Sequence, residues 1–294
     1  MFVLAHLSDP HLSPLPRPRL GELLNKRGLG YLNWQRKRGA VHRADVLEAL
    51  LRDLRSQTFN HLAVTGDLIN IGLDAEIVAA AGWLEDLGVS DEVTLVPGNH
   101  DAYVPMSTPR MLRDWAPYMQ GDDLASFPFV RRRGTVAMIG LSSALPTGPF
   151  MASGRLGRDQ LASLEKMLIS LKGEGLFRVV LIHHPPTSRL KRYLKRLTDG
   201  AQLQAVLRKA GAELVIHGHD HVQRLTWLDG PDRLIPVVGV PSASASSGGR
   251  HQPAGYNMYE IDGAPGAWRC GMIARGFERG GREIKELARQ TLAG

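Results

Sequence analysis

Residues 93–101 have the sequence VTLVPGNHD, an apolar run followed at once by a polar cluster. Residues 93–97 predict a short buried strand, because aliphatic and β-branched side chains follow one another. Gly98 lets the backbone turn tightly and approach a ligand closely. Asn99, His100 and Asp101 then place polar side chains just past the strand. Since sites in open α/β sheets form beyond the carboxyl ends of strands, this stretch predicts an α/β fold with a site at that edge.

Four other polar clusters follow apolar runs in the same way. They are Asp9-Pro10-His11, Gly66-Asp67, His183-His184 and Gly218-His219-Asp220-His221. All five clusters come at the carboxyl ends of predicted strands. They can therefore meet at one edge of the fold, although they are spread over more than two hundred residues.

Short β-rich runs alternate with helical patterns along most of the chain. The runs predict strands at residues 2–8, 61–65, 93–97, 136–142, 178–183 and 214–217. Apolar residues with helical spacing predict helices around residues 47–54, 77–84, 161–171 and 203–207. Further strands are expected at 223–228, 234–240, 257–261 and 268–274, and a terminal helix at 282–292. We therefore expect one domain, residues 1–294, built as a β-sandwich flanked by helices.

The residue types in the five clusters suit metal ions. Imidazole and carboxylate favour divalent Mn, Fe or Zn, and the absence of cysteine disfavours a thiolate zinc site. In loops just past a strand, the pairs Asp9/His11 and His219/His221 can turn toward two neighbouring ions. Each cluster alone has an ordinary explanation, such as a turn, a helix cap or a buried histidine. Their shared order and strand placement favour a common site.

Together the blocks D-x-H, G-D, G-N-H-D, H and G-H-x-H resemble the signature of the calcineurin-like metallophosphoesterases. The blocks frame residues 9–221, about three quarters of the chain. The resemblance implies a hydrolase of phosphate esters, built as a four-layer α/β/β/α sandwich with two divalent metal ions. The His-His-Pro-Pro form of the fourth block looks most like the branch of cyclic-nucleotide and glycerophosphodiester phosphodiesterases.

The resemblance also implies a set of metal ligands. Three side chains would hold one ion: Asp9, His11 and His221. Three would hold the other: Asn99, His183 and His219. Asp67 would bridge the two ions, and His184 would lie behind the ligands or contact the substrate.

The same resemblance implies a mechanism. Two ions about 3.5–4 Å apart can share a hydroxide and hold the phosphoryl oxygens for in-line attack. His100 binds no metal in this scheme. It would stabilise the transferring oxygens or protonate the leaving group, so His100 and Asp67 are the expected catalytic residues. Asn70 stands where relatives often place a residue that orients this histidine, with a helix N-cap as the alternative.

The basic charge is concentrated in one segment. The chain of 294 residues has a net charge of +7, and residues 17–43 hold eight basic side chains and one acidic one. Within residues 20–38 the cations alternate with leucines, Tyr31 and Trp34. This mixture suits an interfacial helix that inserts its aromatics into anionic lipid, or a lid over a lipid-linked substrate. A surface insertion whose apolar side packs on the core explains it equally.

Two more segments are candidates for substrate contact. A basic run at residues 189–196, with Arg189, Lys191, Arg192, Lys195 and Arg196, would face phosphates or lie on a solvated helix. The loop at residues 241–256 is rich in small polar residues and carries Arg250 and His251, which we expect to contact substrate. A flexible hairpin connection explains the same loop composition.

Cellular location can be narrowed from three features. Cys270 is the single cysteine, so no internal disulfide requires an oxidising compartment. The amino-terminal run MFVLA is short for a signal peptide and has no basic region before it. No apolar run approaches the roughly 20 residues of a membrane span. These features predict a cytoplasmic enzyme, with peripheral membrane contact through residues 20–38 as a further expectation.

The leading function is a phosphodiesterase for a small or lipid-linked diester, with phosphomonoesters as additional substrates. A pyrophosphatase acting on a lipid-linked substrate at the membrane surface is an alternative. A nuclease is favoured only by the basic charge, and no regular set of aromatics offers a stacking platform, so nucleic acid is not an expected partner. A non-catalytic scaffold should lack a ligand, and none is missing.

Overall fold

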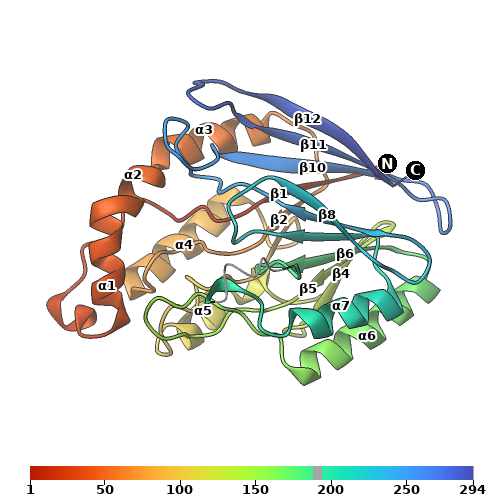
Figure 1. Ribbon diagram of the computed structural model, residues 1–294, viewed down its shortest axis with the longest axis horizontal. Helices are drawn as coiled ribbons and strands as arrows, with labels where there is room; N and C mark the ends of the chain where they lie inside the picture. The colour runs from red at the N-terminus through yellow and green to blue at the C-terminus, as the bar shows by residue number, and fades with distance from the viewer. Residues whose placement is uncertain (188–193, 294) are drawn as a thin grey trace.

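The computed structural model describes residues 1–187 and 194–293. Two six-stranded sheets stand at the centre of this part of the chain, and helices cover the outer face of each sheet (Figure 1). The strand orders are β12-β11-β10-β1-β2-β3 and β4-β5-β6-β7-β9-β8. The arrangement confirms the expected four-layer α/β/β/α sandwich.

The first sheet is mixed. Its strands are β1 (Phe2–Leu7), β2 (His61–Val64), β3 (Val93–Leu95), β10 (Gly255–Asp262), β11 (Arg269–Phe277) and β12 (Ile284–Ala293). β1, β2 and β3 are parallel, whereas β10 pairs antiparallel with β1 and continues into an antiparallel β10-β11-β12 ribbon. Segments from both ends of the chain therefore pair within this one sheet.

The second sheet is mixed in a similar way. Its strands are β4 (Phe129–Arg133), β5 (Val136–Gly140), β6 (Phe177–Ile182), β7 (Leu214–His217), β8 (Arg224–Leu228) and β9 (Ile235–Gly239). β5, β6, β7 and β9 are parallel, and β4 and β8 close the two edges antiparallel. The carboxyl ends of its parallel strands therefore point to a single edge.

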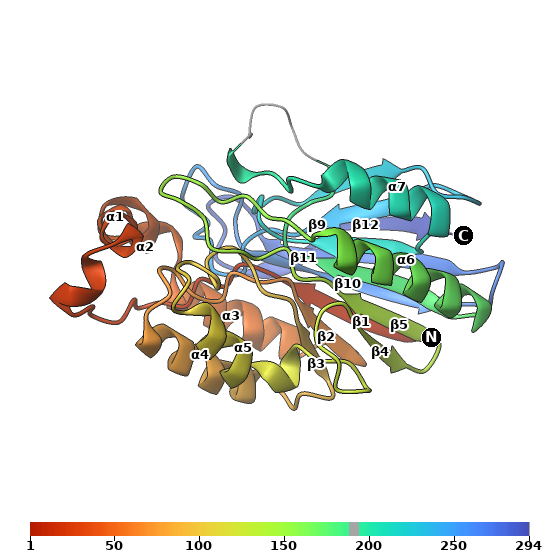
Figure 2. The ribbon, with the colours of Figure 1, turned by 90° about the horizontal axis from the view of Figure 1, so that it is seen from below.

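Alternating side chains divide the core into layers. On β1, Val3, Ala5 and Leu7 pack toward helices, whereas Leu4 packs between the two sheets. The outer helices of the first sheet are α3 (Ala44–Arg55), α4 (Asp74–Leu87) and α5 (Thr108–Asp114). Those of the second sheet are α6 (Arg158–Gly173) and α7 (Gly200–Ala210). Figure 2 shows the two helical layers on opposite sides of the paired sheets.

A helical segment leaves the body between β1 and α3 and lies at one end of the molecule (Figure 1). It contains η1 (Leu20–Leu23), α1 (Lys26–Asn33), η2 (Trp34–Arg38) and α2 (Gly39–Val41). Trp34 is buried and stacks on His42 at 6.2 Å between ring centroids, and Tyr31 packs against the cluster around Ile71. The expectation that Trp34 inserts into lipid is therefore wrong, because this side of the segment packs on the core.

The predicted terminal helix at residues 282–292 is also wrong. These residues include most of β12, which pairs with β11. Glutamate, leucine, alanine and arginine favour helix in isolation, but pairing with an open sheet edge overrides this weak preference. Charged side chains such as Lys285 and Arg289 face solvent there, as is common on edge strands. The short edge strand β4, with its three arginines, gave no strand signal in the sequence.

Within residues 1–187 and 194–293, every helix is too short or too polar to cross a membrane.

Candidate metal centre

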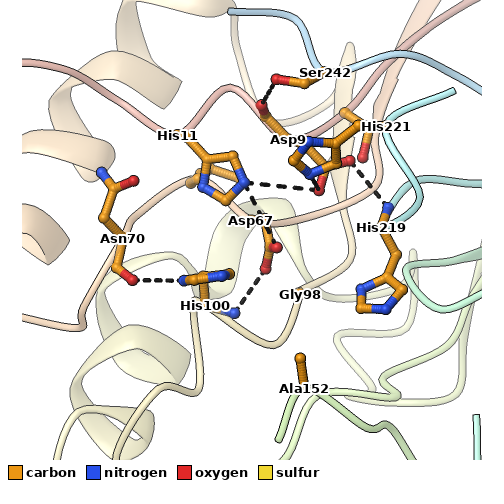
Figure 3. A network of polar contacts seen from close by, with 12 residues as sticks. Asp9, His11, Asp67, Asn70, Gly98, His100, Ala152, His219, His221 and Ser242 are labelled. Atoms are coloured by element: carbon orange, nitrogen blue, oxygen red, sulfur yellow. Dashed lines mark hydrogen bonds and ion pairs between the residues drawn. The ribbon is translucent and has the colours of Figure 1, made fainter. Parts of the chain in front are cut away.

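The five polar clusters meet beyond the carboxyl ends of β1, β2, β3, β6 and β7. Figure 3 shows Asp9, Asp67 and His100 from three of them at this place. Backbone hydrogen bonds join their loops: Asp9 N donates to Gly66 O at 2.9 Å, and His11 N donates to Asp67 O at 3.1 Å. A Cβ atom on Gly218 would lie 2.4 Å from Asp9 Oδ2, so only glycine fits at that position. The loops are thus locked together, and their side chains project into one space.

The backbone is strained at this place. Five site residues have positive φ angles: Asp9 (53°), His11 (41°), Asp67 (55°), His219 (65°) and His221 (54°). Only Leu124 and Phe150 share this feature among the other non-glycine residues that the structure describes. The left-handed region is costly for residues with a Cβ, so the surrounding structure must enforce it. Strain gathered at one place is typical of a functional site.

One group of possible ligands consists of Asp9, His11, Asp67 and His221, with ligand atoms within 4.8 Å of one another. His221 Nε2 lies 3.0 Å from Asp9 Oδ1, and His11 Nε2 lies 4.0 Å from the same oxygen. His11 Nε2 also lies 3.8 Å from Asp67 Oδ2. Ligands that sit about 2.0–2.2 Å from one ion are roughly 3–4 Å apart, so this group could hold a divalent metal.

A second group shares the Asp67 carboxylate. Asp67 Oδ2 lies 3.4 Å from His183 Nε2, which in turn lies 3.3 Å from His219 Nδ1. Asn99 is buried, and its Oδ1 has no hydrogen-bond partner among the described residues. A buried amide oxygen without a partner costs free energy unless an ion or ligand satisfies it. The imidazole, carboxylate and amide donors therefore fit divalent metal ions.

Backbone carbonyls orient two of these histidines. His11 Nδ1 donates to Ile69 O at 3.2 Å, and His183 Nδ1 donates to Thr65 O at 2.6 Å. With Nδ1 donating in each ring, Nε2 is the nitrogen that faces Asp67 and could bind a metal. Metal-binding histidines are commonly fixed by such a contact on the other ring nitrogen.

His184 differs from its neighbour in this respect. Its Nε2 donates to Ala152 O at 3.1 Å, and its Nδ1 accepts from Ser143 Oγ at 2.8 Å. Although His184 lies close enough to His183 and His219 to form a candidate ligand group, both of its nitrogens already have partners. The geometry therefore favours His183 as the ligand and leaves His184 behind it.

His100 lies beside the cluster (Figure 3). Its backbone N donates to Asp67 Oδ1 at 2.7 Å, and its Nδ1 donates to the backbone oxygen of Asn70 at 2.5 Å. Tyr103 stacks on the ring with 5.5 Å between centroids. Asn70 contacts the histidine through its carbonyl rather than through its side chain, because the side-chain Nδ2 donates to Leu12 O at 2.9 Å.

Buried charges dominate the electrostatics. Burial lowers the pKa of His100 to about 3, and the Arg38 charge adds to the effect. Burial, followed by the Arg38 charge, also lowers the pKa of His11 well below its usual range. Burial opposes protonation of His183, but the negative charge of Asp67 outweighs it and raises the pKa to about 10. The Asp67 carboxylate thus stabilises positive charge next to it, and a cation site needs such a negative group.

Sequence patterns missed the role of Asp101, although it belongs to the GNHD block. Its carboxylate accepts from the backbone N of Asp67, Leu68, Ile69 and Gly98 at 2.7–3.2 Å. These contacts clamp the loop after β2 to the loop after β3. Burial, followed by the Asp67 charge, raises the pKa of Asp101 to about 7.

Two further site neighbours come from the helical segment. The Arg38 guanidinium lies between His11 and His100, and the His42 ring lies 4.3 Å from that of His11 between centroids. His42 belongs to a possible ligand group with His11 and His221, and its Nδ1 contacts Ser244 Oγ at 3.0 Å. No motif marked either residue, because their place depends on how residues 34–42 fold back.

The remaining candidates lie outside this cluster or outside the described residues. Arg250 and His251 are exposed on their loop. From the same loop, Ser242 Oγ donates to Asp9 O at 2.7 Å, so its buried start supports the centre. Arg189, Lys191 and Arg192 of the second basic run lie outside the described residues.

Comparison with known proteins places this geometry in a family. The calcineurin-like phosphoesterase family model matches residues 2–223. The chain belongs to the calcineurin-like phosphoesterases. Its His and Asp groups agree with the divalent metal ions that this family uses. The predicted family is thus confirmed, and the function class follows as a hydrolase of phosphoric esters.

Solved structures show the same fold for this phosphoesterase at low sequence identity. A dimetal phosphatase from Danio rerio is 14% identical, with a TM-score of 0.54 and 98% of each chain covered. The purple acid phosphatase PPD1 from yellow lupin (Lupinus luteus) is 10% identical, with a TM-score of 0.59 over 97% of this chain and 52% of that one. A comparison with curated protein sequences found no match.

Proposed function

We propose that this calcineurin-like phosphoesterase hydrolyses phosphodiesters with two divalent transition-metal ions. One observation carries the proposal: Asp67 Oδ2 lies 3.8 Å from His11 Nε2 and 3.4 Å from His183 Nε2. A carboxylate oxygen flanked by one histidine of each group suits a ligand that bridges two ions. The unpartnered Asn99 Oδ1 supports the second ion.

The chain offers three ligands to each ion in addition to the shared Asp67. One set is Asp9, His11 and His221. The other set is Asn99, His183 and His219. These nitrogen and oxygen donors suit Mn, Fe or Zn. When bound, the ions would polarise the phosphoryl oxygens and activate the attacking water.

His100 would act on the bound ester. The carbonyl of Asn70 holds its Nδ1, and Tyr103 stacks on its face, so the ring is fixed with Nε2 toward the centre. At this place the ring would stabilise the transferring oxygens or serve the leaving group. His100 would thus act without binding a metal.

A substrate panel tests the proposed reaction. Protein reconstituted with Mn should hydrolyse bis-p-nitrophenyl phosphate with a higher kcat/KM than p-nitrophenyl phosphate. Cyclic nucleotides and phospholipid head-group diesters complete the panel. A preference for the monoester would contradict a phosphodiesterase. Cleavage of oligonucleotides that falls steeply with salt would instead indicate a nuclease.

We further propose that the substrate is lipid-linked and that the enzyme, located in the cytoplasm, meets it at the membrane surface. Leu20 and Leu24 are 87% and 88% exposed. Four basic side chains near them are exposed: Arg17, Arg19, Arg36 and Lys37. Apolar side chains flanked by cations suit an anionic lipid surface, and each cation near the surface adds about 1 kcal/mol of attraction.

This surface predicts binding to vesicles. We expect the wild-type protein to co-sediment with phosphatidylglycerol vesicles, more strongly at low than at moderate salt. Changing Arg17, Arg19, Arg36 and Lys37 to Gln should release it, and so should Leu20→Ser with Leu24→Ser. A control with Val89→Ser and Leu234→Ser, 63% and 54% exposed, alters exposed apolar side chains outside the helical segment. Equal recovery of all four proteins, or of none, would argue for a soluble substrate.

A further inference from the structure

Arg38 enters the candidate metal centre from the end of η2. Its Nη1 lies 2.7 Å from His100 Nε2, and its Nη2 lies 2.9 Å from His11 Nε2. The two imidazoles are 5.0 Å apart between centroids, and Figure 3 shows both beside Asp67. One guanidinium therefore connects the proposed metal ligand with the proposed catalytic histidine.

The charge of Arg38 lacks a direct counter-charge. Among the described residues, no carboxylate lies within 4.0 Å of its guanidinium. Guanidinium offers five N–H donors and no acceptor, whereas the two imidazoles offer only single neutral lone pairs. A largely desolvated cation without an anionic partner is costly. The Arg38 guanidinium can therefore still donate hydrogen bonds to an anion with several acceptor oxygens.

The contact with His11 does not use an imidazole lone pair. Arg38 Nη2 lies 2.9 Å from His11 Nε2 and 3.1 Å from His11 Nδ1, so it sits over the ring rather than along the lone pair of either nitrogen. His11 Nδ1 donates to Ile69 O at 3.2 Å, and Nε2 stays available to a metal. The Nη2 group therefore still lacks a well-aligned acceptor. A phosphoryl group bound at the centre offers non-bridging oxygens at this place, and guanidinium binds such oxygens in a two-point fork.

We propose that Arg38 is a substrate-binding residue whose guanidinium holds the phosphoryl oxygens beside the metal centre. The inference rests on the proposed function. Next to the guanidinium is a cavity of about 40 Å³, lined in part by Trp34, Arg38, His100 and Tyr103. This space leaves the guanidinium room to move away from its contacts with the two rings. The helical segment thus supplies a phosphate ligand as well as an exposed surface.

A purely structural role for Arg38 makes a different prediction. A residue that only fastens the segment to the body would affect stability and leave phosphate affinity unchanged. A residue that only fills the metal position would compete with the ions, so its removal would increase metal binding. Phosphate affinity and metal content, measured together, separate the three roles.

The test uses Mn-reconstituted protein titrated with inorganic phosphate by calorimetry. Arg38→Ala should raise the dissociation constant roughly 10–100-fold, the loss expected for charge-assisted hydrogen bonds. Arg38→Lys should raise it less, because lysine keeps the charge but lacks the fork. Arg52→Gln, which changes an exposed cation on α3, should leave the dissociation constant within about twofold of the wild type. Metal content should remain that of the wild type in all three.

Unchanged phosphate affinity in Arg38→Ala, or tighter binding with extra metal, would overturn the inference. If circular dichroism shows that Arg38→Ala is unfolded, Arg38→Lys decides, and an affinity within about twofold of wild type would then count against the role. Suppose that the wild type holds metal and hydrolyses diesters, but the Arg38 variants bind phosphate as tightly as the wild type. Only this inference would then be refuted. Wild-type protein without metal or hydrolysis would refute the proposed function itself.

Discussion

Asp67→Asn is expected to lower the metal content from about two ions per chain to one or fewer and to reduce diester hydrolysis to background. Asp67 Oδ2 is the oxygen that both ligand groups share, at 3.8 Å from His11 Nε2 and 3.4 Å from His183 Nε2. Asparagine keeps the size of the side chain but removes the charge that draws cations to this place. Elemental analysis after reconstitution with Mn measures the effect.

The loss should exceed the roughly 10–100-fold fall in metal affinity that removal of an outer hydrogen-bond partner causes. Since Asp67 Oδ1 also accepts from the backbone N of His100 at 2.7 Å, circular dichroism should accompany the analysis. A folded Asp67→Asn protein that keeps both ions would contradict the bridging role.

His100→Ala is expected to lower kcat roughly 10²–10⁴-fold while leaving metal content nearly unchanged. The ring is held by Asn70 and Tyr103, and it belongs to neither group of ligand atoms described above. Its removal therefore takes away a contact with the reacting ester without opening the metal centre. Steady-state kinetics with bis-p-nitrophenyl phosphate gives the rate.

The paired variants serve as controls for one another. His100→Ala should lose rate and keep metal, and Asp67→Asn should lose both. If the two proteins lost metal to the same degree, the division between a catalytic histidine and a bridging carboxylate would be wrong.

Much of the fold and of the centre could be predicted because the decisive signals are local. Where a buried strand is followed by Gly-Asp or Gly-Asn-His-Asp, the turn after the strand can be predicted from the local sequence. Parallel strands then bring these turns together at their carboxyl ends. The structure brings Asp9, His11, Asp67, His183 and His221 together from four such local patterns. Their assignment as metal ligands remains a proposal.

The contribution of the helical segment could not be predicted in the same way. Arg38 and His42 stand in no motif, and they reach the centre only because Trp34 and Tyr31 pack the segment onto the body. Charge alone suggested a lipid surface for all five cations of residues 20–38. Arg27 is instead buried and donates to Ile71 O at 3.3 Å, so tertiary packing divides the cations between two roles.

The edge of the first sheet gives a second example. Residues 284–293 favour helix by composition, yet they form the ten-residue strand β12, which pairs with β11 at eight positions. The partner lies outside the local sequence, so a local pattern could not reveal it. Local patterns missed β4 for the same reason. They also could not decide whether His183 or His184 is the better candidate metal ligand, whereas the hydrogen bonds of both ring nitrogens of His184 favour His183.

Each chain is expected to hold a pair of divalent ions across Asp67. The decisive measurement is elemental analysis of the purified wild-type protein, after reconstitution with Mn and removal of free metal. About two ions per chain should be found. A ratio that stays near zero would refute the two-metal centre.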